Sequence, residues 1–205
     1  SLVRDHIVRR SPEGIANASV LVLDARGMAV RAMVGSADFF NHAIAGQVNG
    51  AMAQRSPGSA LKPFVYALAM DRGLIHPASL MKDAPRRYGG FTPENYDQRF
   101  LGPLAAREAL ILSRNLPAAH LQTRLGESGF HDFLLQAGIR GLKPATFYGL
   151  ALSLGGVEVS MLELASLYAA LASGGELRPV RMLKHASDAT APKRILSPEA
   201  SFLVL

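Results

Sequence analysis

A serine and a lysine three residues apart form the pattern best suited to covalent chemistry, Ser59-Ala-Leu-Lys62. On a helix these positions share a face and side chains lean toward the N-terminus, so Lys62 would lie over Ser59. A neutral lysine there could take the hydroxyl proton and make the serine a nucleophile. This chemistry requires a lysine pKa well below the ordinary value of about 10.4. A helix N-terminus would add backbone N–H donors for an oxyanion.

The same four-residue pattern occurs a second time, as Ser79-Leu-Met-Lys82. Ser59 follows a Ser-Pro-Gly turn and precedes an apolar run that predicts a helix, whereas Ser79 lies in a proline-rich stretch. The context therefore favours Ser59. The alternative for Ser59 is a helix N-cap, a position that serine fills well. Pro63 disfavours helical angles at Lys62, which a helix tolerates only near its start.

Ser113 and Asn115 form a second candidate pair, between two predicted helical segments. The Ser113 hydroxyl could relay a proton, and the Asn115 amide could hold a substrate carbonyl or the lysine. The alternative is helix punctuation, since serine and asparagine favour caps and turns. The six histidines show no metal-ligand spacing, and the chain has no phosphate-binding, dinucleotide-binding or nucleophile-elbow motif. We therefore expect no metal and no cofactor.

The composition fits one globular domain or two small ones, with 205 residues of which 49% are hydrophobic and 19% charged. The absence of cysteine excludes disulfides, thiolate metal sites and a cysteine nucleophile. The net charge of +6 is scattered, which argues against nucleic-acid binding and leaves open attraction to an anionic surface or substrate. We expect no membrane span, because no apolar run approaches the ~20 residues that a bilayer requires, and no signal peptide at the start of this sequence.

The predicted elements are one early hairpin followed mainly by helices. The hairpin is expected at 18–23 and 28–34, around a turn that ends in glycine. Apolar periodicity predicts helices at 59–72, 103–112, 117–126, 130–136, 145–154 and 161–172. A loop is expected over 74–102, and 177–183 is a weak strand candidate. Because a lone hairpin is marginal, it must extend a larger sheet, so we expect the domain to continue beyond residue 205.

Taken together, these residues resemble a known family. Arg55-Ser-Pro-Gly-Ser-Ala-Leu-Lys-Pro-Phe64 is similar to the nucleophile segment of class A penicillin-binding proteins. Other stretches resemble the same family in the same order: Glu94-Asn-Tyr-Asp97, Gly102-Pro103, Arg107-Glu-Ala-Leu110, Ser113-Arg-Asn-Leu-Pro-Ala118, Leu154-Gly-Gly-Val-Glu-Val-Ser160 and Leu162-Glu-Leu-Ala165. Gln47-Val-Asn-Gly50 and His76-Pro-Ala-Ser79 look like the 1C type. The resemblance covers about residues 18–205.

The resemblance implies an α/β (α+β) fold of the penicillin-binding and serine β-lactamase type. In that fold an antiparallel sheet lies between helical clusters, and only the first hairpin and the mostly helical part are expected here. The implied activity is peptidoglycan D,D-transpeptidation. Ser59 would attack a stem peptide that ends in D-Ala-D-Ala, with Lys62 as base. Ser113 would pass the proton to the leaving D-alanine, and Asn115 would hold the substrate amide. Penicillins and other β-lactams would acylate the same serine.

The resemblance also implies a larger protein on the periplasmic side of the bacterial inner membrane. Its glycosyltransferase domain and its membrane anchor are expected upstream of these residues. The family's third motif, Lys-Thr-Gly or Lys-Ser-Gly, follows none of the five lysines here. In the family that motif lies beyond the point where this sequence stops, and it supplies a carboxylate contact and half of the oxyanion hole. Residues 1–205 are therefore expected to be a partial transpeptidase domain, weak or inactive alone.

Two alternatives and one further departure accompany this interpretation. Arg114 replaces an aspartate in the middle of the second motif, where the family tolerates different residues. The missing third motif leaves open a non-catalytic module on the same scaffold, which would sense β-lactams or bind the cell wall. A hydrolytic β-lactamase would need a deacylating base, and no glutamate is evidently placed for that role.

Overall fold

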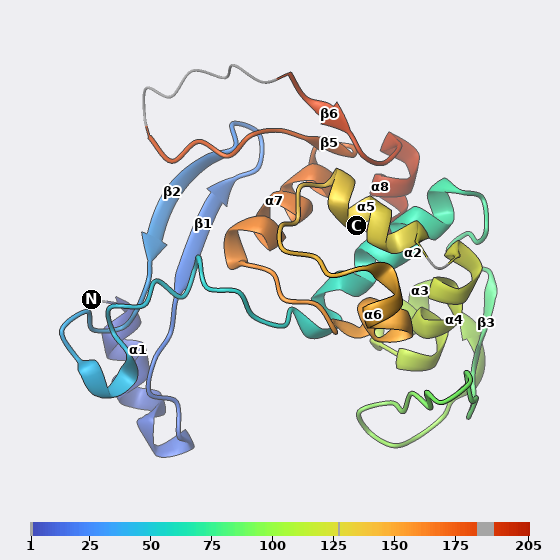
Figure 1. The fold of residues 1–205 in the computed structure, drawn as a ribbon, viewed down its shortest axis with the longest axis horizontal. Helices are drawn as coiled ribbons and strands as arrows, with labels where there is room; N and C mark the ends of the chain where they lie inside the picture. The colour runs from blue at the N-terminus through green and yellow to red at the C-terminus, as the bar shows by residue number, and fades with distance from the viewer. Residues whose placement is uncertain (1, 127, 184–190) are drawn as a thin grey trace.

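A central helix, α2 (Lys62–Asp71), organises the larger part of the molecule. The computed structural model describes residues 2–126, 128–183 and 191–205 (Figure 1). All residues of α2 except Pro63 and Asp71 are buried, and the helix packs against α4 (Asn115–Leu125) and α8 (Pro198–Val204). A helix that is apolar on every side belongs in the middle of a core. Lys62, at its first position, is the one charged side chain among the buried residues of α2.

The other helices are α1 (Leu2–Arg10), η1 (Ser11–Glu13), η2 (His42–Ile44), η3 (Gly58–Leu61), α3 (Ala106–Ile111), α5 (Gly129–Gln136), α6 (Ala145–Tyr148), η4 (Gly149–Leu154) and α7 (Met161–Ala172). α3, α4, α8, η3 and η4 contact α2, whereas α1, η1 and η2 lie away from this core. Phe64 on α2 contacts Phe133 of α5 and Tyr168 of α7, with ring centroids 6.5 Å and 5.0 Å apart. The α2 core therefore joins helices from across the chain.

Three two-stranded antiparallel sheets occur in the described part of the chain. β1 (Val20–Asp24) pairs with β2 (Ala29–Val34), and β5 (Glu176–Leu177) pairs with β6 (Lys193–Arg194). β3 (Leu80–Asp83) pairs with β4 (Gly102–Ala105). The β1–β2 hairpin lies at one side of the molecule with α1 at its base and contacts the core through α7 (Figure 1).

Several sequence predictions are confirmed. The hairpin forms at the predicted place, and the helix predicted over 161–172 forms with those bounds. The helix predicted from residue 59 begins as the short 3-10 turn η3, and α2 proper begins at Lys62. α5 begins one residue before the prediction, and α4 begins at Asn115, two residues early. Pro117 therefore lies within the first turn of α4, where its missing N–H costs no hydrogen bond.

Other predictions are wrong. No helix begins at residue 103, because Pro103 lies in β4 opposite Lys82 and the helix starts at Ala106. The stretch 74–102 is accordingly not all loop, since it contains β3. The helix predicted over 145–154 is divided at Gly149, whose φ of +51° belongs to the left-handed region. α1 and α8 were not predicted.

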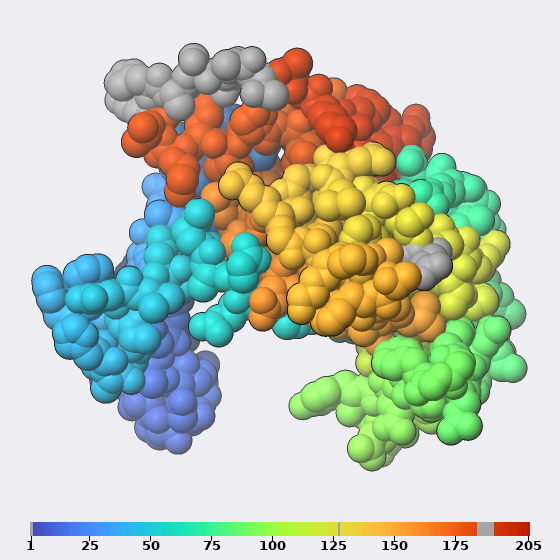
Figure 2. All heavy atoms as spheres, in the orientation of Figure 1, coloured from blue at the N-terminus to red at the C-terminus, as the bar shows by residue number. Residues whose placement is uncertain are grey.

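The surface is hollowed on one side. Figure 2 shows the N-terminal segment with α1 (blue) and the loop around residues 85–100 (green) standing apart, with an open space between them. Residues near 50–60 (teal) border that space in this view. Among the described residues, no helix is long and apolar enough to cross a membrane.

Candidate active site

Ser59 is exposed and lies on the 3-10 turn η3, immediately before α2. Three contacts hold this turn. The Ser56 hydroxyl donates to the Gly155 carbonyl at 2.7 Å, and the Tyr168 hydroxyl donates to the Ala60 carbonyl at 2.9 Å. The Lys62 backbone N–H donates to the Ser59 carbonyl. The N-cap of α2 is Leu61, so the N-cap role considered for Ser59 is excluded.

Gly155 lets η4 approach this turn closely. A Cβ at Gly155 would lie 2.4 Å from the Gly58 Cα, and the residue has a φ of +88°. Any other residue would both strain the backbone and displace the turn. The Gly155–Gly58 contact thus fixes the position of Ser59 relative to η4.

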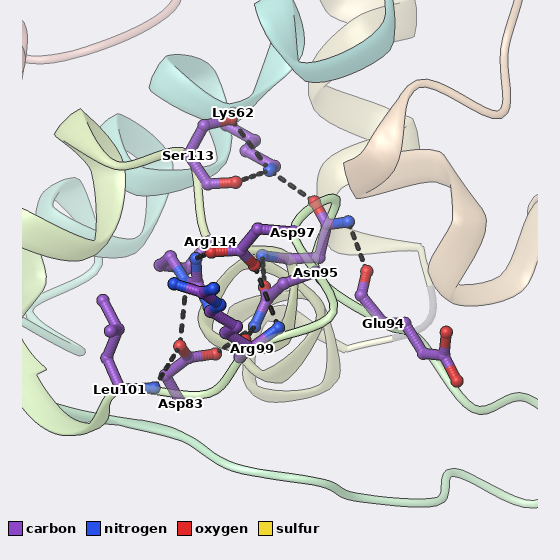
Figure 3. Close-up of polar contacts among 10 residues, drawn as sticks. Lys62, Asp83, Glu94, Asn95, Asp97, Arg99, Leu101, Ser113 and Arg114 are labelled. Atoms are coloured by element: carbon purple, nitrogen blue, oxygen red, sulfur yellow. Dashed lines mark hydrogen bonds and ion pairs between the residues drawn. The ribbon is translucent and has the colours of Figure 1, made fainter.

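Lys62 is 1% exposed, and its amine is surrounded by oxygen atoms of the second predicted pair. The Nζ donates to the Ser113 carbonyl at 2.5 Å, to the Ser113 Oγ at 3.1 Å and to the Asn115 Oδ1 at 2.5 Å (Figure 3). Burial and, after it, the charge of Arg114 lower the pKa of Lys62 to about 8. About one amine in ten is then neutral at pH 7.

A neutral Lys62 can exchange protons with Ser113. The neutral amine keeps two N–H donors and gains a lone pair. The Ser113 backbone carbonyl and the Asn115 Oδ1 can then accept from Nζ, while the Ser113 hydroxyl donates to it. The structure therefore provides a hydrogen-bonded path from the amine to a second hydroxyl. This is the arrangement that a proton relay requires.

The predicted residues converge on one cavity of about 500 Å³. Ser59, Ser113 and Asn115 line it, with Asn95, Tyr96 and Arg114 among their neighbours. Lys62 does not line the cavity but reaches Ser113 and Asn115 from the buried N-terminus of α2. All four predicted site residues are thus brought together, from η3, α2 and the junction of α3 with α4. The volume suits a small peptide or drug-sized ligand.

Ser113 has a strained backbone. The Ser113 N–H donates to the Leu110 carbonyl and the Arg114 N–H to the Ala109 carbonyl, both at 2.9 Å, which is the Schellman pattern at the end of α3. Ser113 takes the left-handed position of that motif with a φ of +53°, where glycine is usual. A non-glycine residue there costs on the order of 1 kcal/mol or more. The hydroxyl is retained at a cost in stability.

Replacing Ser113 by glycine should affect stability and the acylation rate in opposite directions. We expect Ser113→Gly to raise the free energy of unfolding by about 1 kcal/mol, or Tm by about 2–4 °C, because the strain is relieved. We expect the rate of acylation at Ser59 to fall about tenfold or more, because a proton relay through Ser113 would need its hydroxyl. Ser113→Ala is the control, since it loses the hydroxyl but keeps the strain. A Tm for Ser113→Gly at or below that of Ser113→Ala would refute the strain argument.

Arg114 holds the junction of α3 and α4 in place. It is 6% exposed, and its Nε donates to the Asp83 Oδ2 at 2.8 Å and its NH1 to the Asp97 Oδ2 at 2.9 Å (Figure 3). A further bond runs to the Arg99 carbonyl. The Arg114 hydrogen bond is the main cause that lowers the pKa of Asp97. The buried guanidinium is therefore matched by two carboxylates.

Two asparagines complete this network. The buried Asn95 donates to the Asp83 Oδ1 at 2.7 Å and accepts from the Asn115 N–H at 2.7 Å. The Asn115 Nδ2 donates to the Glu94 carbonyl at 2.6 Å (Figure 3). Of the two uses considered for the Asn115 amide, the structure thus shows it holding the lysine. Its Nδ2 keeps one N–H for a further partner.

Sequence reasoning missed the roles of Asp83, Asn95, Asp97 and Arg114. From the sequence, Asp97 was only the last residue of a family-like stretch, and Arg114 was only a variable motif position. The partners of Arg114 lie 31 and 17 residues away along the chain, so no local spacing indicates them. The one sign of this network in the sequence was a basic residue, Arg114, inside the otherwise uncharged Ser-Arg-Asn motif.

The second Ser-x-x-Lys pattern does not form a comparable site. Lys82 lies on β3, where residues do not follow helical spacing, and the Ser79 Oγ accepts from the His76 N–H at 2.9 Å. In the part of the chain that the structure describes, no three His, Asp or Glu side chains converge as metal ligands would.

With this geometry in view, comparison with known proteins shows the family. Residues 18–204 match the model of the penicillin-binding protein transpeptidase domain. The chain belongs to that family. This transpeptidase-family chain is 38% identical to penicillin-binding protein 1C of Escherichia coli K12 over 187 residues, which is 91% of the chain and 24% of that relative. It is 34% identical to penicillin-binding protein 1F of Bacillus subtilis over 163 residues, 78% of the chain and 22% of the relative.

Solved structures show the same fold. A crystal structure titled a peptidoglycan glycosyltransferase from Burkholderia ambifaria superposes with a TM-score of 0.82 at 20% identity, covering 99% of this chain and 69% of that one. Penicillin-binding protein 1A from Haemophilus influenzae gives a TM-score of 0.78 at 24% identity, covering 92% of this chain and 34% of that one. The fold class expected for this transpeptidase-family chain is thereby confirmed. The chain spans about a quarter of the length of the curated relatives named above.

Proposed function

We propose that this chain carries out the acyl-transfer chemistry of peptidoglycan D,D-transpeptidation, with Ser59 as nucleophile. The observation that supports this most directly is the buried Lys62 amine, whose pKa is lowered to about 8 and which contacts both Ser113 and Asn115. Ser59 lines the same cavity as those two residues. A base, a relay hydroxyl and an exposed nucleophile are the parts that serine acyl transfer requires.

In the proposed mechanism the neutral Lys62 amine takes the Ser59 proton as the oxygen attacks the penultimate carbonyl of a stem ending in D-Ala-D-Ala. The proton passes through the Ser113 hydroxyl to the nitrogen of the departing D-alanine, and a Ser59 ester remains. An amine from a neighbouring stem then attacks this ester, gives up its proton along the same path, and restores the serine. A β-lactam ring would open on Ser59 in the same first step.

The role of the whole protein is part of the same proposal. We infer that residues 1–205 are a partial transpeptidase domain of a penicillin-binding protein on the periplasmic side of the inner membrane, where a glycosyltransferase domain and an anchor precede it. The proposed partners are peptidoglycan stem peptides and β-lactams. Because the Lys-Thr-Gly motif is not in this sequence, we expect residues 1–205 alone to be acylated slowly or not at all. Loss of one oxyanion donor typically costs about 10²–10³ in rate.

Two other activities predict different outcomes. A non-catalytic β-lactam-sensing or wall-binding module would be acylated stably without turnover of peptide. A β-lactamase needs a base to activate water, but among the described residues no glutamate lines the cavity and its carboxylate, Asp97, is paired with Arg114. The geometry therefore gives hydrolysis less support than transfer.

A cross-linking assay on the complete gene product distinguishes these activities. The substrate is a stem pentapeptide donor ending in D-Ala-D-Ala together with an amine acceptor. We expect release of D-alanine in step with the appearance of cross-linked dimer, both blocked by penicillin. Acylation by penicillin with no peptide product would indicate the sensing module, and release of penicilloic acid as the main product would indicate a β-lactamase.

The pH dependence of acylation tests whether the neutral form of the Lys62 amine is the reactive one. Because the amine acts in its neutral form and its pKa is about 8, the second-order rate constant should rise about tenfold per pH unit below 8 and level off above it. Stopped-flow measurement with a fluorescent penicillin between pH 6 and 10 gives this profile. A rate that is constant over this range would show that no such group controls the step.

A further inference from the structure

A second cavity, of about 690 Å³, lies outside the candidate active site and shares no lining residue with it. Its walls are β3, the loop that follows β3, and one face of α4. Leu116, His120 and Arg124 line it from α4, and their spacing of four residues places them on that one face. β3 and α4 thus supply about half of the lining, loops supply the rest, and the volume is that of a small-molecule site.

The charge of this cavity is uncompensated. Lys82, Arg86 and Arg124 line it, and its lining contains no aspartate or glutamate. Within the described parts of the chain, none of these three cations makes an ion pair. Basic side chains gathered in one concave site without acidic partners create a positive potential that attracts anions.

Aromatic side chains position one of these cations. The Arg86 guanidinium lies over the Tyr88 ring at 5.0 Å, and its NH1 is 3.4 Å from the His120 Nδ1. Because arginine only donates, this contact needs a neutral ring with Nδ1 as acceptor. Burial, followed by the charges of Arg86 and Arg124, lowers the pKa of His120, so the ring is neutral at pH 7. Arg86 and Arg124 thus both lie near His120, where one ligand could contact them.

The remaining wall is apolar. Ile75, Met81 and Leu116 line the cavity and are between 1% and 7% exposed. Guanidinium groups bind carboxylate and phosphate through paired charge-assisted hydrogen bonds. An apolar wall with basic groups near it suits a ligand that has an oxyanion at one end and an apolar body at the other.

We propose that this cavity binds an organic anion, in which a carboxylate or phosphate group is attached to an apolar body. Arg86 and Arg124 contact the oxyanion, and Leu116 contacts the apolar part. Nothing in this proposal depends on the acyl-transfer chemistry at Ser59, because the two cavities have separate linings.

Titration of the complete gene product with simple probes, followed by ¹⁵N NMR, tests the site. The probes are phenyl phosphate, phenylacetate, inorganic phosphate and the neutral phenol. We expect phenyl phosphate or phenylacetate to shift the amide signals of Leu116 and His120 saturably, with a Kd near 1 mM or below, on the order expected for a ligand of this size. The probe that binds more tightly identifies the class of oxyanion.

Matched variants locate the binding. Arg86→Gln and Arg124→Gln should each raise the Kd of the more tightly bound probe about tenfold, since a charge-assisted hydrogen bond contributes roughly that factor to affinity. Arg87→Gln, which removes the neighbouring exposed arginine of the same loop that does not line the cavity, should leave Kd unchanged. An unchanged Tm checks that each variant is folded. The proposal is overturned if neither anion binds below about 10 mM, if phenol binds as tightly, if inorganic phosphate matches phenyl phosphate, or if Arg87→Gln weakens binding equally.

Discussion

Replacing Ser59 by alanine is expected to abolish covalent labelling by a fluorescent penicillin and to reduce D,D-transpeptidation by on the order of 10³-fold or more, because no ester can form without the hydroxyl. Ser59 is exposed and caps no helix, so its removal should leave Tm almost unchanged. Labelling is measured on a denaturing gel with the complete gene product. Loss of the label at an unchanged Tm would show that the Ser59 hydroxyl is needed for the reaction and not for folding.

The control for this experiment is Ser79→Ala, which alters the second Ser-x-x-Lys pattern. Ser79 does not line the cavity that contains Ser59, so the variant should keep the label. If Ser59→Ala retained the label, the proposed nucleophile would be wrong. If Ser79→Ala lost it, the choice between the two patterns would be wrong.

Replacing Lys62 by methionine is expected to lower the acylation rate constant by about 10²–10⁴, the usual contribution of a general base. Methionine occupies a similar volume, so the buried N-terminus of α2 should stay packed. Arginine at this position keeps a positive charge but cannot lose its proton, so Lys62→Arg should be equally slow. The measurement is the second-order acylation rate by stopped flow.

The pH profile separates a lost base from a disturbed structure. In Lys62→Met the residual rate should no longer rise through pH 8, because the group that titrates there in the parent is gone. Lys82→Met, at the lysine of the second pattern, should keep both the rate and the rise. An unchanged pH profile in Lys62→Met would assign the titration to another residue.

The fold could be predicted where local patterns decide it. The hairpin and α7 follow from alternation, helical periodicity and punctuation by glycine, and the structure reproduces them. The β3–β4 pair could not be found this way, since its strands are four residues long and 18 residues of irregular chain separate Asp83 from Gly102. Pro103 was taken as a helix start because proline favours that position, yet it also fits a strand where its absent N–H is not needed.

The candidate site was predictable in part. Ser59 and Lys62 are close in sequence, and Ser113 and Asn115 occupy a visible break between helices, so four of the residues that meet could be named in advance. The network around Arg114 depends on tertiary contacts with Asp83 and Asp97, which no spacing rule indicates. The lowered pKa of Lys62 likewise depends on its burial and on the Arg114 charge, which only the folded chain brings together.

The position of the β-lactam adduct tests the central claim most directly. Trypsin should release Ser59 within residues 56–72, since Pro63 protects the bond after Lys62, and Ser113 within residues 108–114. After the complete gene product is treated with penicillin, mass spectrometry should find one added penicilloyl mass on 56–72, and fragmentation should place it on Ser59. An adduct on Ser56, on the peptide 108–114 or elsewhere, or no adduct at all, would contradict Ser59 as the nucleophile.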